Sequence, residues 1–357
     1  MHLVKLDIND VRNLSELSLP CHPRFNIISG KNAAGKTAIL ESIHLLARVS
    51  SFRTPRISDV IQHGKNNLSV TALIKDKEDR QIITGIEKGR RSTQIKFNGN
   101  KVLKRSEQAR NLPVITITTE SHRLLYGTPR ERRHWLDWSM FHVEQGYMQN
   151  WHDYHYALRQ RNALLRTTLD KKQYEGWEET LAKKAVKLRK ARGEYVARIS
   201  ELLKETINTN SANITINLHS AEEDENQIRA GLAQQRKSDA AAGHTQNGPH
   251  REDIIFTVND REAGKVLSRG EGKQLVMFLL VVQAEEYRRR TGRTPLLLVD
   301  DLPSELDEAA REKVLNMLEK QNQQLFITTT NTDLLDLKGL PHTVFHVEHG
   351  KLVKVVE

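Results

Sequence analysis

The stretch Gly30-Lys-Asn-Ala-Ala-Gly35-Lys36-Thr37 matches the phosphate-binding pattern G-x-x-x-x-G-K-[ST]. Residues 25–29 before it predict a short strand, and residues 37–48 after it carry apolar side chains at helical spacing. A glycine turn that only caps a helix is the structural alternative. The strand–loop–helix context favours a nucleotide site, because N–H groups of the loop and of the helix N-terminus would face the phosphates. The expected nucleotide contacts are Gly30, Lys31, Asn32, Ala33, Ala34, Gly35, Lys36 and Thr37, with Lys36 at the β- and γ-phosphate oxygens.

A second stretch, Leu296-Leu-Leu-Val-Asp300-Asp301, places two carboxylates after four apolar residues. This order predicts a buried parallel strand whose C-terminal end opens onto a ligand site. We expect Asp300 to hold a Mg²⁺ ion together with Thr37, and Asp301 to orient or deprotonate the attacking water. Taken alone, the stretch also fits an exposed aspartate pair that opens a turn. If Thr37 and Asp300 share one ion, both ends of the chain contribute strands to one sheet.

A third stretch, Leu267-Ser268-Arg-Gly270-Glu271-Gly-Lys-Gln-Leu275, precedes a strongly apolar helix. Ser268 and Gly270 at a helix N-terminus would form a second anion-binding surface, suited to the γ-phosphate of a nucleotide held by another copy of the chain. ATP would then join two chains in an ATP-dependent homodimer. The alternative is a serine that caps an ordinary core helix.

The charge balance of the chain favours polyanionic partners. The 357 residues contain 55 Lys and Arg against 45 Asp and Glu, a net charge of +10. Such a balance is typical of proteins that bind nucleic acid, although a solvated basic surface is the plain alternative. The longest nearly pure apolar run, residues 275–284, is about half of the roughly 20 residues that span a bilayer, and no export signal precedes the first strand. We therefore expect a cytoplasmic protein with no membrane association.

The pattern along the chain predicts an α/β head interrupted by a helical lobe. Short strands joined by tight turns, including Asn98-Gly99, predict an antiparallel meander over residues 68–103. Long helical stretches rich in charge follow from about 130 to 206, and residues 221–248 are polar and are expected to include a mobile loop. The predicted division is an ATPase head from residues 1–115 and 245–357, with residues 116–244 as a mostly helical arm.

One helix of this arm carries a basic stripe. Lys183, Lys187 and Lys190 share one helical face, and the apolar Leu181, Ala185, Leu188 and Tyr195 share another. If the apolar face packs, the lysines face outward and are candidates for DNA phosphate contacts; a solvated face is the alternative. A weaker group of DNA-contact candidates is Arg130, Arg132 and Arg133.

These residues together resemble the RecF family of recombination proteins, whose heads are of the ABC/SMC ATPase class. The resemblance runs in one consistent order from residue 10 to about 307. Beyond the ATPase motifs, it rests on Asp10-Val-Arg12-Asn13 (like F-R-N), Ser51-Phe52-Arg53-Thr54 (S-F-R), Arg132-Arg133-His-Trp-Leu136-Asp137 (R-R-x-F-L-D), Arg161-Asn162-Ala-Leu-Leu165 (R-N-A-L-L), Gly248-Pro249-His250-Arg-Glu-Asp253 (G-P-H-R-D-D) and Ser304-Glu305-Leu306-Asp307 (S-E-L-D).

The resemblance implies a weak, DNA-stimulated ATPase that dimerises around ATP as a clamp on gapped DNA or single-strand/duplex junctions. It also implies work with RecR and RecO in loading RecA, and a nucleotide contact by Arg12. The chain departs from the family pattern at Glu271 and Thr119, and residues 328–330 lack the switch histidine of transporters. A nucleotide-binding scaffold without useful hydrolysis is the remaining alternative, and the presence of both Lys36 and Asp301 argues against it.

Overall fold

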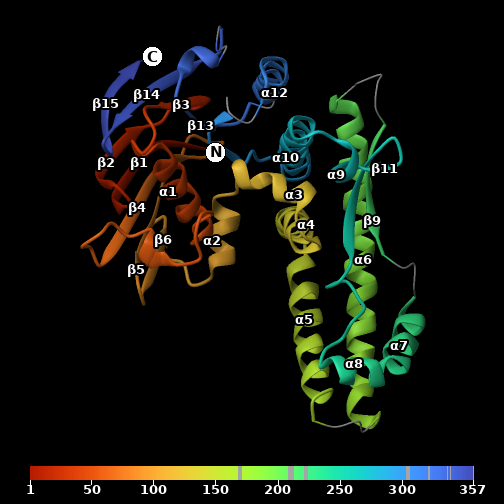
Figure 1. The fold of residues 1–357 in the computed structure, drawn as a ribbon. Helices are drawn as coiled ribbons and strands as arrows, with labels where there is room; N and C mark the ends of the chain where they lie inside the picture. Colours follow the sequence, from red (N-terminus) through yellow and green to blue (C-terminus); the bar gives the residue numbers. More distant parts are fainter. Residues whose placement is uncertain are drawn as a thin grey trace. The chain divides into compact units, whose positions relative to one another are not determined.

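The phosphate-binding pattern lies between strand β3 (Phe25–Ser29) and helix α1 (Lys36–Arg48), as the sequence predicts. The computed structural model describes residues 1–167, 171–207, 213–220, 224–302, 306–320, 322–335, 337 and 339–356. They form two compact units, the first Met1–Ser121 with Arg269–Glu357 and the second His122–Ser268. The first unit is therefore built from both ends of the chain (Figure 1).

The division at 268/269 lies later than the boundary at 244/245 that the sequence suggests. The physical reason is strand pairing: β10 (Asp253–Val258) pairs antiparallel with β9 (Ile214–His219), and β11 (Arg261–Glu262) pairs with β10. These strands therefore stay with the second unit, since their ladder hydrogen bonds are made there.

One sheet of the first unit is antiparallel, with the order β2-β1-β4-β5-β6-β7. The predicted meander is confirmed, and Asn98 and Gly99 form its tight turn with φ angles of 49° and 78°. The strands are β1 (His2–Val11), β2 (Leu14–Pro20), β4 (Asn67–Lys75), β5 (Gln81–Gly89), β6 (Thr93–Phe97) and β7 (Asn100–Lys101).

The second sheet of this unit has the order β15-β14-β3-β13-β12-β8 and holds the phosphate-loop strand near its centre. Strand β3 pairs in parallel with β13 on one side and β14 on the other, with Phe25 opposite both Leu325 and His342. The prediction that both ends of the chain share one sheet is therefore confirmed. The other strands are β8 (Val114–Ile117), β12 (Leu296–Val299), β13 (Leu325–Thr329), β14 (His342–Glu348) and β15 (Lys351–Val356).

Helix α1 lies between the two sheets. Its apolar side chains Ile39, Leu40 and Ile43 are fully buried in one core with residues of both sheets, among them Leu6 and Phe326. Burial on most sides fits the apolar positions of this helix, and the core also encloses the polar side chains of Glu41 and Ser42. Among the described residues, the unit's other helices are α2 (Arg105–Asn111), α10 (Arg269–Thr291) and α12 (Glu308–Lys320), with short 3₁₀ turns at Ile57–Asp59, Thr119–His122 and Thr332–Leu334.

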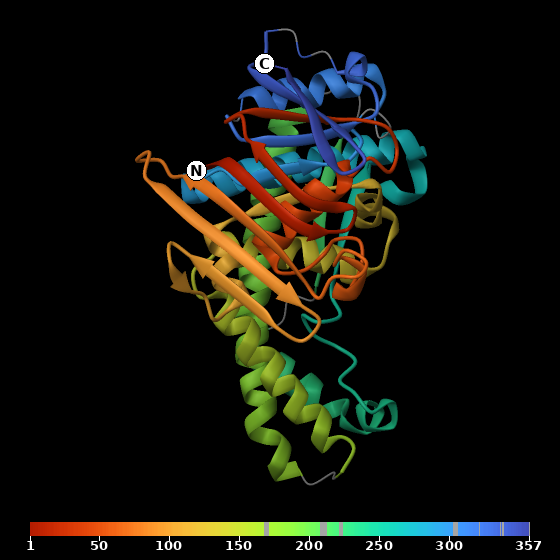
Figure 2. The ribbon, with the colours of Figure 1, turned by 90° about the vertical axis from the view of Figure 1, so that its left-hand side faces the viewer.

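The second unit is mostly helical, and its two longest helices, α5 (Tyr147–Leu164) and α6 (Lys171–Ile207), pack along each other (Figure 1, Figure 2). Its other helices are α3 (Arg123–Tyr126), α4 (Pro129–Val143), α7 (Glu225–Gln234), α8 (Arg236–Ala242) and α9 (Ala263–Val266). Within the described ranges, no helix of the chain is both long and apolar enough to span a bilayer.

Helices α7 and α8 occupy much of the polar stretch 221–248, of which residues 221–223 lie outside the described residues. Asp224 and Gln227 form a capping box at the start of α7, with two reciprocal hydrogen bonds of 2.8 Å. The D-x-x-Q spacing is a sequence signal for a helix start that the polar composition obscured.

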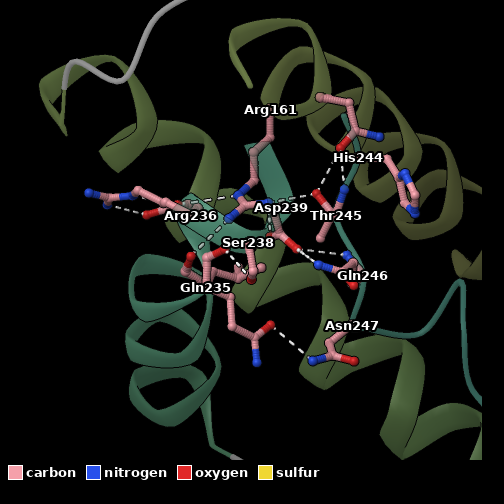
Figure 3. A network of polar contacts seen from close by, with 12 residues as sticks. Arg161, Gln235, Arg236, Ser238, Asp239, His244, Thr245, Gln246 and Asn247 are labelled. Carbon is pink, nitrogen blue, oxygen red and sulfur yellow. Dashed lines mark hydrogen bonds and ion pairs between the residues drawn. The ribbon is translucent and has the colours of Figure 1, made fainter. Parts of the chain in front are cut away.

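A buried polar network joins these helices to α5 and α6 (Figure 3). The Arg161 guanidinium donates 2.7 Å hydrogen bonds to Asp239 Oδ2 and Thr245 Oγ1 and a 3.2 Å bond to Glu178 Oε1. Arg161 and Asp239 are both fully buried. Arg161, from the R-N-A-L-L stretch, therefore holds α8 and the segment after it against helices α5 and α6.

We expect Arg161→Leu to lower the free energy of unfolding of the second unit by about 3–5 kcal/mol, because the buried Asp239 carboxylate loses its cation, while Glu178 keeps its ion pair with Arg236. All four tryptophans lie in this unit, so urea unfolding followed by tryptophan fluorescence reports on it. The control is Arg166→Leu, an exposed arginine of the same region, with an expected change within about 0.5 kcal/mol. Equal stability of the two variants would contradict the role of the network.

Candidate functional site

The loop between β3 and α1 has the backbone shape of a phosphate cradle. Ala33 has a φ of 63°, and Gly35 precedes α1 with a φ of 116° and no side-chain cap. Gly30 has a φ of 151°, and a Cβ there would lie 2.3 Å from the Val347 carbonyl oxygen of β14. Only glycine fits this approach, so the first glycine of the pattern lets the loop pack against the C-terminal hairpin.

Lys36 is buried and lies across the loop. Its ammonium donates hydrogen bonds to the carbonyl oxygens of Gly30 (2.7 Å) and Lys31 (2.9 Å). Burial lowers the pKa of Lys36, and the nearby carboxylates of Asp301 and Asp300 partly oppose this shift. The structure therefore brings the predicted phosphate lysine and both predicted carboxylates to one place.

Thr37 and Asp300 are in direct contact at the head of α1. The Thr37 hydroxyl donates to the Asp300 carboxylate, at 2.9 Å from Oδ1 and 3.2 Å from Oδ2. A hydroxyl beside a carboxylate is the all-oxygen donor set that suits Mg²⁺, so the two residues fit the predicted ion. Asp301 follows in the left-handed region, with a φ of 55°.

Thr328, at the end of β13, hydrogen-bonds both aspartates, a role that no motif in the sequence indicated. Its hydroxyl donates to Asp300 Oδ1 at 2.7 Å and accepts the Asp301 backbone N–H at 2.8 Å. The sequence marks Thr328 only as a position without the transporter histidine. The available signal was its place at the C-terminal end of a buried strand, where side chains reach the ligand edge of a parallel sheet.

Two turns support the back of the phosphate loop. Asn13, in the β1–β2 turn, donates from Nδ2 to the Ala33 carbonyl at 3.1 Å. Gly350, in the β14–β15 turn, donates its N–H to the Ala34 carbonyl at 2.8 Å. A Cβ on Gly350 would lie 2.2 Å from the Asn13 carbonyl oxygen, so both turns and the loop are in close contact. No local motif indicates these contacts, because they join residues far apart in sequence.

Arg12 lies beside α1 and is paired with a carboxylate. Its Nε and Nη2 atoms donate 2.8 Å hydrogen bonds to the two oxygens of Glu41, which is fully buried, and its Nη1 atom donates to the Asp59 carbonyl. The hydrogen bonds that Arg12 donates to Glu41 raise the pKa of Arg12. The nucleotide contact that the resemblance implies for Arg12 stays a prediction.

The third motif spans the division between the units. Ser268 is the last residue of the second unit, where its carbonyl accepts a 3.3 Å hydrogen bond from the Tyr126 hydroxyl, and α10 begins at Arg269 in the first unit. A Cβ on Gly270 would meet no atom within 4 Å. This open helix start suits a contact with a second chain, which stays a prediction. Of the S-E-L-D stretch, Ser304 and Glu305 lie outside the described residues.

The predicted DNA-contact residues divide into two groups. Lys183, Lys187 and Lys190 are exposed while the apolar residues of α6 are buried, which confirms that the stripe faces outward; Arg130 is exposed as well. Arg132, by contrast, makes a bidentate ion pair with Asp253, and Arg133 donates to the Glu252 carbonyl at 2.6 Å. These contacts give Arg132 and Arg133 a structural role at the start of β10.

Comparison with known proteins places this site in context. A family model described as the RecF/RecN/SMC N terminal domain matches residues 2–352. The DNA replication and repair protein RecF of Stutzerimonas stutzeri (strain A1501) is 34% identical, with 99% of this chain and 98% of the relative covered. The protein of that name from Azotobacter vinelandii (strain DJ / ATCC BAA-1303) is also 34% identical and covers 99% of each chain.

Solved structures agree with these relatives. The recombination mediator protein RecF-ATPrS in the RecFOR pathway is 25% identical with a TM-score of 0.86, and 98% of this chain and 97% of that chain are covered. The RecF-ATP structure is 24% identical with a TM-score of 0.88 and coverages of 100% and 98%. An Smc head bound to the C-winged helix domain of ScpA is 14% identical with a TM-score of 0.62 and coverages of 100% and 98%, which shows a shared fold alone.

The contact between Gly350 and the loop makes a prediction about nucleotide affinity. We expect Gly350→Ala to weaken binding of a fluorescent ATP analogue by about tenfold, or about 1.4 kcal/mol, because the added Cβ forces the hairpin turn off Asn13 and the loop. Gly99→Ala is the matched control. It places the same residue at a similar φ of 78° in another hairpin turn, where a Cβ meets no atom within 4 Å. If both variants bind the analogue equally well, the hairpin does not position the loop.

Proposed function

This chain belongs to the RecF family of DNA replication and repair proteins, with the predicted ABC/SMC-type ATPase-head fold, and we propose that it is an ATP-dependent DNA-binding recombination protein. Two copies would close around ATP as a clamp on gapped DNA or single-strand/duplex junctions. The observation that carries the proposal is the Thr37–Asp300 hydrogen bond, because it joins the phosphate loop to the acidic strand in one oxygen-lined site.

In this proposal the loop residues bind the ATP phosphates through their N–H groups, and Lys36 neutralises charge on the β- and γ-phosphates. Thr37 and Asp300 would hold Mg²⁺, which would offset phosphate charge when bound. Asp301 accepts a proton from the attacking water, and Thr328 fixes the backbone from which Asp301 projects. The solved RecF-ATP structure, which shares this fold, supports ATP as the nucleotide.

We propose weak hydrolysis that DNA stimulates, because the second half of the site comes from another chain. Ser268 and Gly270 at the start of α10 would contact the γ-phosphate of the nucleotide held by the partner copy. ATP binding would then close the clamp, and hydrolysis would release it.

The DNA would contact Lys183, Lys187, Lys190 and Arg130, the exposed cations of the second unit that the sequence analysis singled out. RecR and RecO are the proposed protein partners, and RecA loading is the proposed outcome. Support for them comes from the RecFOR pathway in which the structural neighbours act.

The first test is the molar mass of the full chain by light scattering with ATP and Mg²⁺, with and without a gapped duplex. We expect the 40.9 kDa native chain to double in mass and Ser268→Arg to remain monomeric, because the arginine side chain blocks the interface. Ser238→Arg, at an exposed serine of the same unit, is the control and is expected to dimerise. A native monomer under every condition would contradict the clamp.

A second test addresses the lysine stripe. We expect Lys183→Glu, Lys187→Glu and Lys190→Glu together to weaken DNA binding and to flatten the log–log salt dependence by about 0.9 per lost phosphate contact. The control reverses the charge of three other exposed lysines of the unit by Lys→Glu substitution; these are Lys204, Lys237 and Lys265. Fluorescence anisotropy with labelled DNA measures both sets, and equal losses in the two sets would rule out a specific role for the stripe.

A further inference from the structure

A basic cavity lies in the first unit, at the C-terminal end of α1. It has a volume of about 700 Å³ and is lined by the loop after α1, by the β5–β6 turn and by the start of α2. Five of its lining residues are cationic, and the lining includes no aspartate or glutamate. The five are Arg53, Lys88, Arg90, Arg91 and Arg105.

Lys88 is the buried member of this cluster, with an exposed fraction of 8%. Its ammonium donates one hydrogen bond, at 2.6 Å, to the Val49 carbonyl. Burial, and to a lesser extent the charge of Arg105, lower the pKa of Lys88. No described carboxylate makes an ion pair with Lys88, and burying a cation without an anion costs free energy. An anion in the cavity would offset that cost.

The lining favours phosphate groups of a polymer. Arg90, Arg91 and Arg105 are exposed, so the cluster offers several cations at once to a chain of linked phosphates. The one aromatic ring in the lining, Phe52, packs edge-on against His44 at a centroid distance of 5.3 Å and is partly buried against the hydrophobic core. A lining dominated by cations suits the sugar-phosphate backbone, which carries no sequence information.

We propose that this cavity is a phosphate-binding site for the DNA backbone, with Lys88 as its buried anchor and Arg90 and Arg91 as its rim. The proposal rests on the DNA-binding function proposed above and adds a contact region on the ATPase unit. Its lining residue Ser51 donates a 2.5 Å hydrogen bond to Glu41, the carboxylate that also pairs with Arg12. Glu41 lies in α1, the helix that begins at the phosphate loop. DNA bound here therefore stimulates ATP hydrolysis through α1.

The test compares Arg90→Ser/Arg91→Ser with Arg80→Ser/Lys101→Ser, a control that removes the same charge from exposed positions of the same sheet outside the cavity. DNA binding of the full chain is measured by anisotropy with ATP and Mg²⁺ between roughly 50 and 200 mM salt. We expect the cavity variant to flatten the log–log slope by about 1.8, or 0.9 per contact, and the control to match the native chain. ATP affinity should be unchanged, and DNA stimulation of hydrolysis should be lost in the cavity variant alone.

Two further outcomes separate the site from the general function. If the native chain binds DNA with ATP and the cavity variant keeps the native slope, the cavity proposal is overturned while the proposed function stands. If the native chain binds no DNA, both are overturned.

Lys88→Met distinguishes the source of the phosphate. The apolar side chain suits the buried position, and the variant is expected to fold. We expect it to weaken DNA binding. We also expect tripolyphosphate, added while the phosphate loop is saturated with a non-hydrolysable ATP analogue and Mg²⁺, to raise the melting temperature of the native chain but not of this variant. If the variant loses this stabilisation but binds DNA as the native chain does, the cavity takes a small free anion and the DNA assignment is wrong. Should Lys88→Met fail to fold, the two exposed arginines still decide the question.

Discussion

The hydrogen bond between Thr37 and Asp300 joins residues 263 positions apart. It requires the strands before these two residues, β3 and β12, to lie in the same sheet. Strand β3 enters the phosphate loop while paired on both sides with strands from the C-terminal part of the chain. Parallel pairing places the C-terminal ends of β3, β12 and β13 at one edge, where the loop, Asp300 and Thr328 meet. The second unit is therefore inserted in the chain between strands that pair in one sheet of the first unit.

The local part of this arrangement was predictable, because each motif carries its own signal. Glycine spacing predicted the loop, and an apolar run before two carboxylates predicted the buried strand. The supports were not predictable: Asn13 contacts the loop through its side-chain Nδ2 and Gly350 through its backbone N–H, and both contacts depend on register between distant strands. The position of Thr328 at the end of a buried strand was predictable, but its hydrogen bonds depend on β12 and β13 being neighbours in the sheet.

The arginines show a second limit of sequence patterns, which reveal charge but not the partner of a charge. Arg132 and Arg161 belong to family motifs, and both form ion pairs with carboxylates of the second unit. The lysines of α6 occupy helical positions opposite a buried apolar face, and periodicity alone predicts that they face solvent. Lysine ammonium groups on flexible stems also suit mobile phosphate contacts, whereas planar guanidinium groups fit fixed bidentate pairs.

Glu41 contacts both Arg12 and the loop that lines the basic cavity, so it connects the two proposed sites for nucleotide and DNA. The Glu41 carboxylate has no exposed surface and lies in the helix that begins at Lys36; it is stabilised by hydrogen bonds from Arg12 and Ser51 and by an ion pair with Arg53 at 3.9 Å. Any movement of α1 that pulls Glu41 from these partners carries the cost of an unpaired buried charge. Arg12 and the Ser51 loop are therefore bound to move with α1. In the proposed coupling, a change at the phosphate loop would reach the wall of the basic cavity through α1.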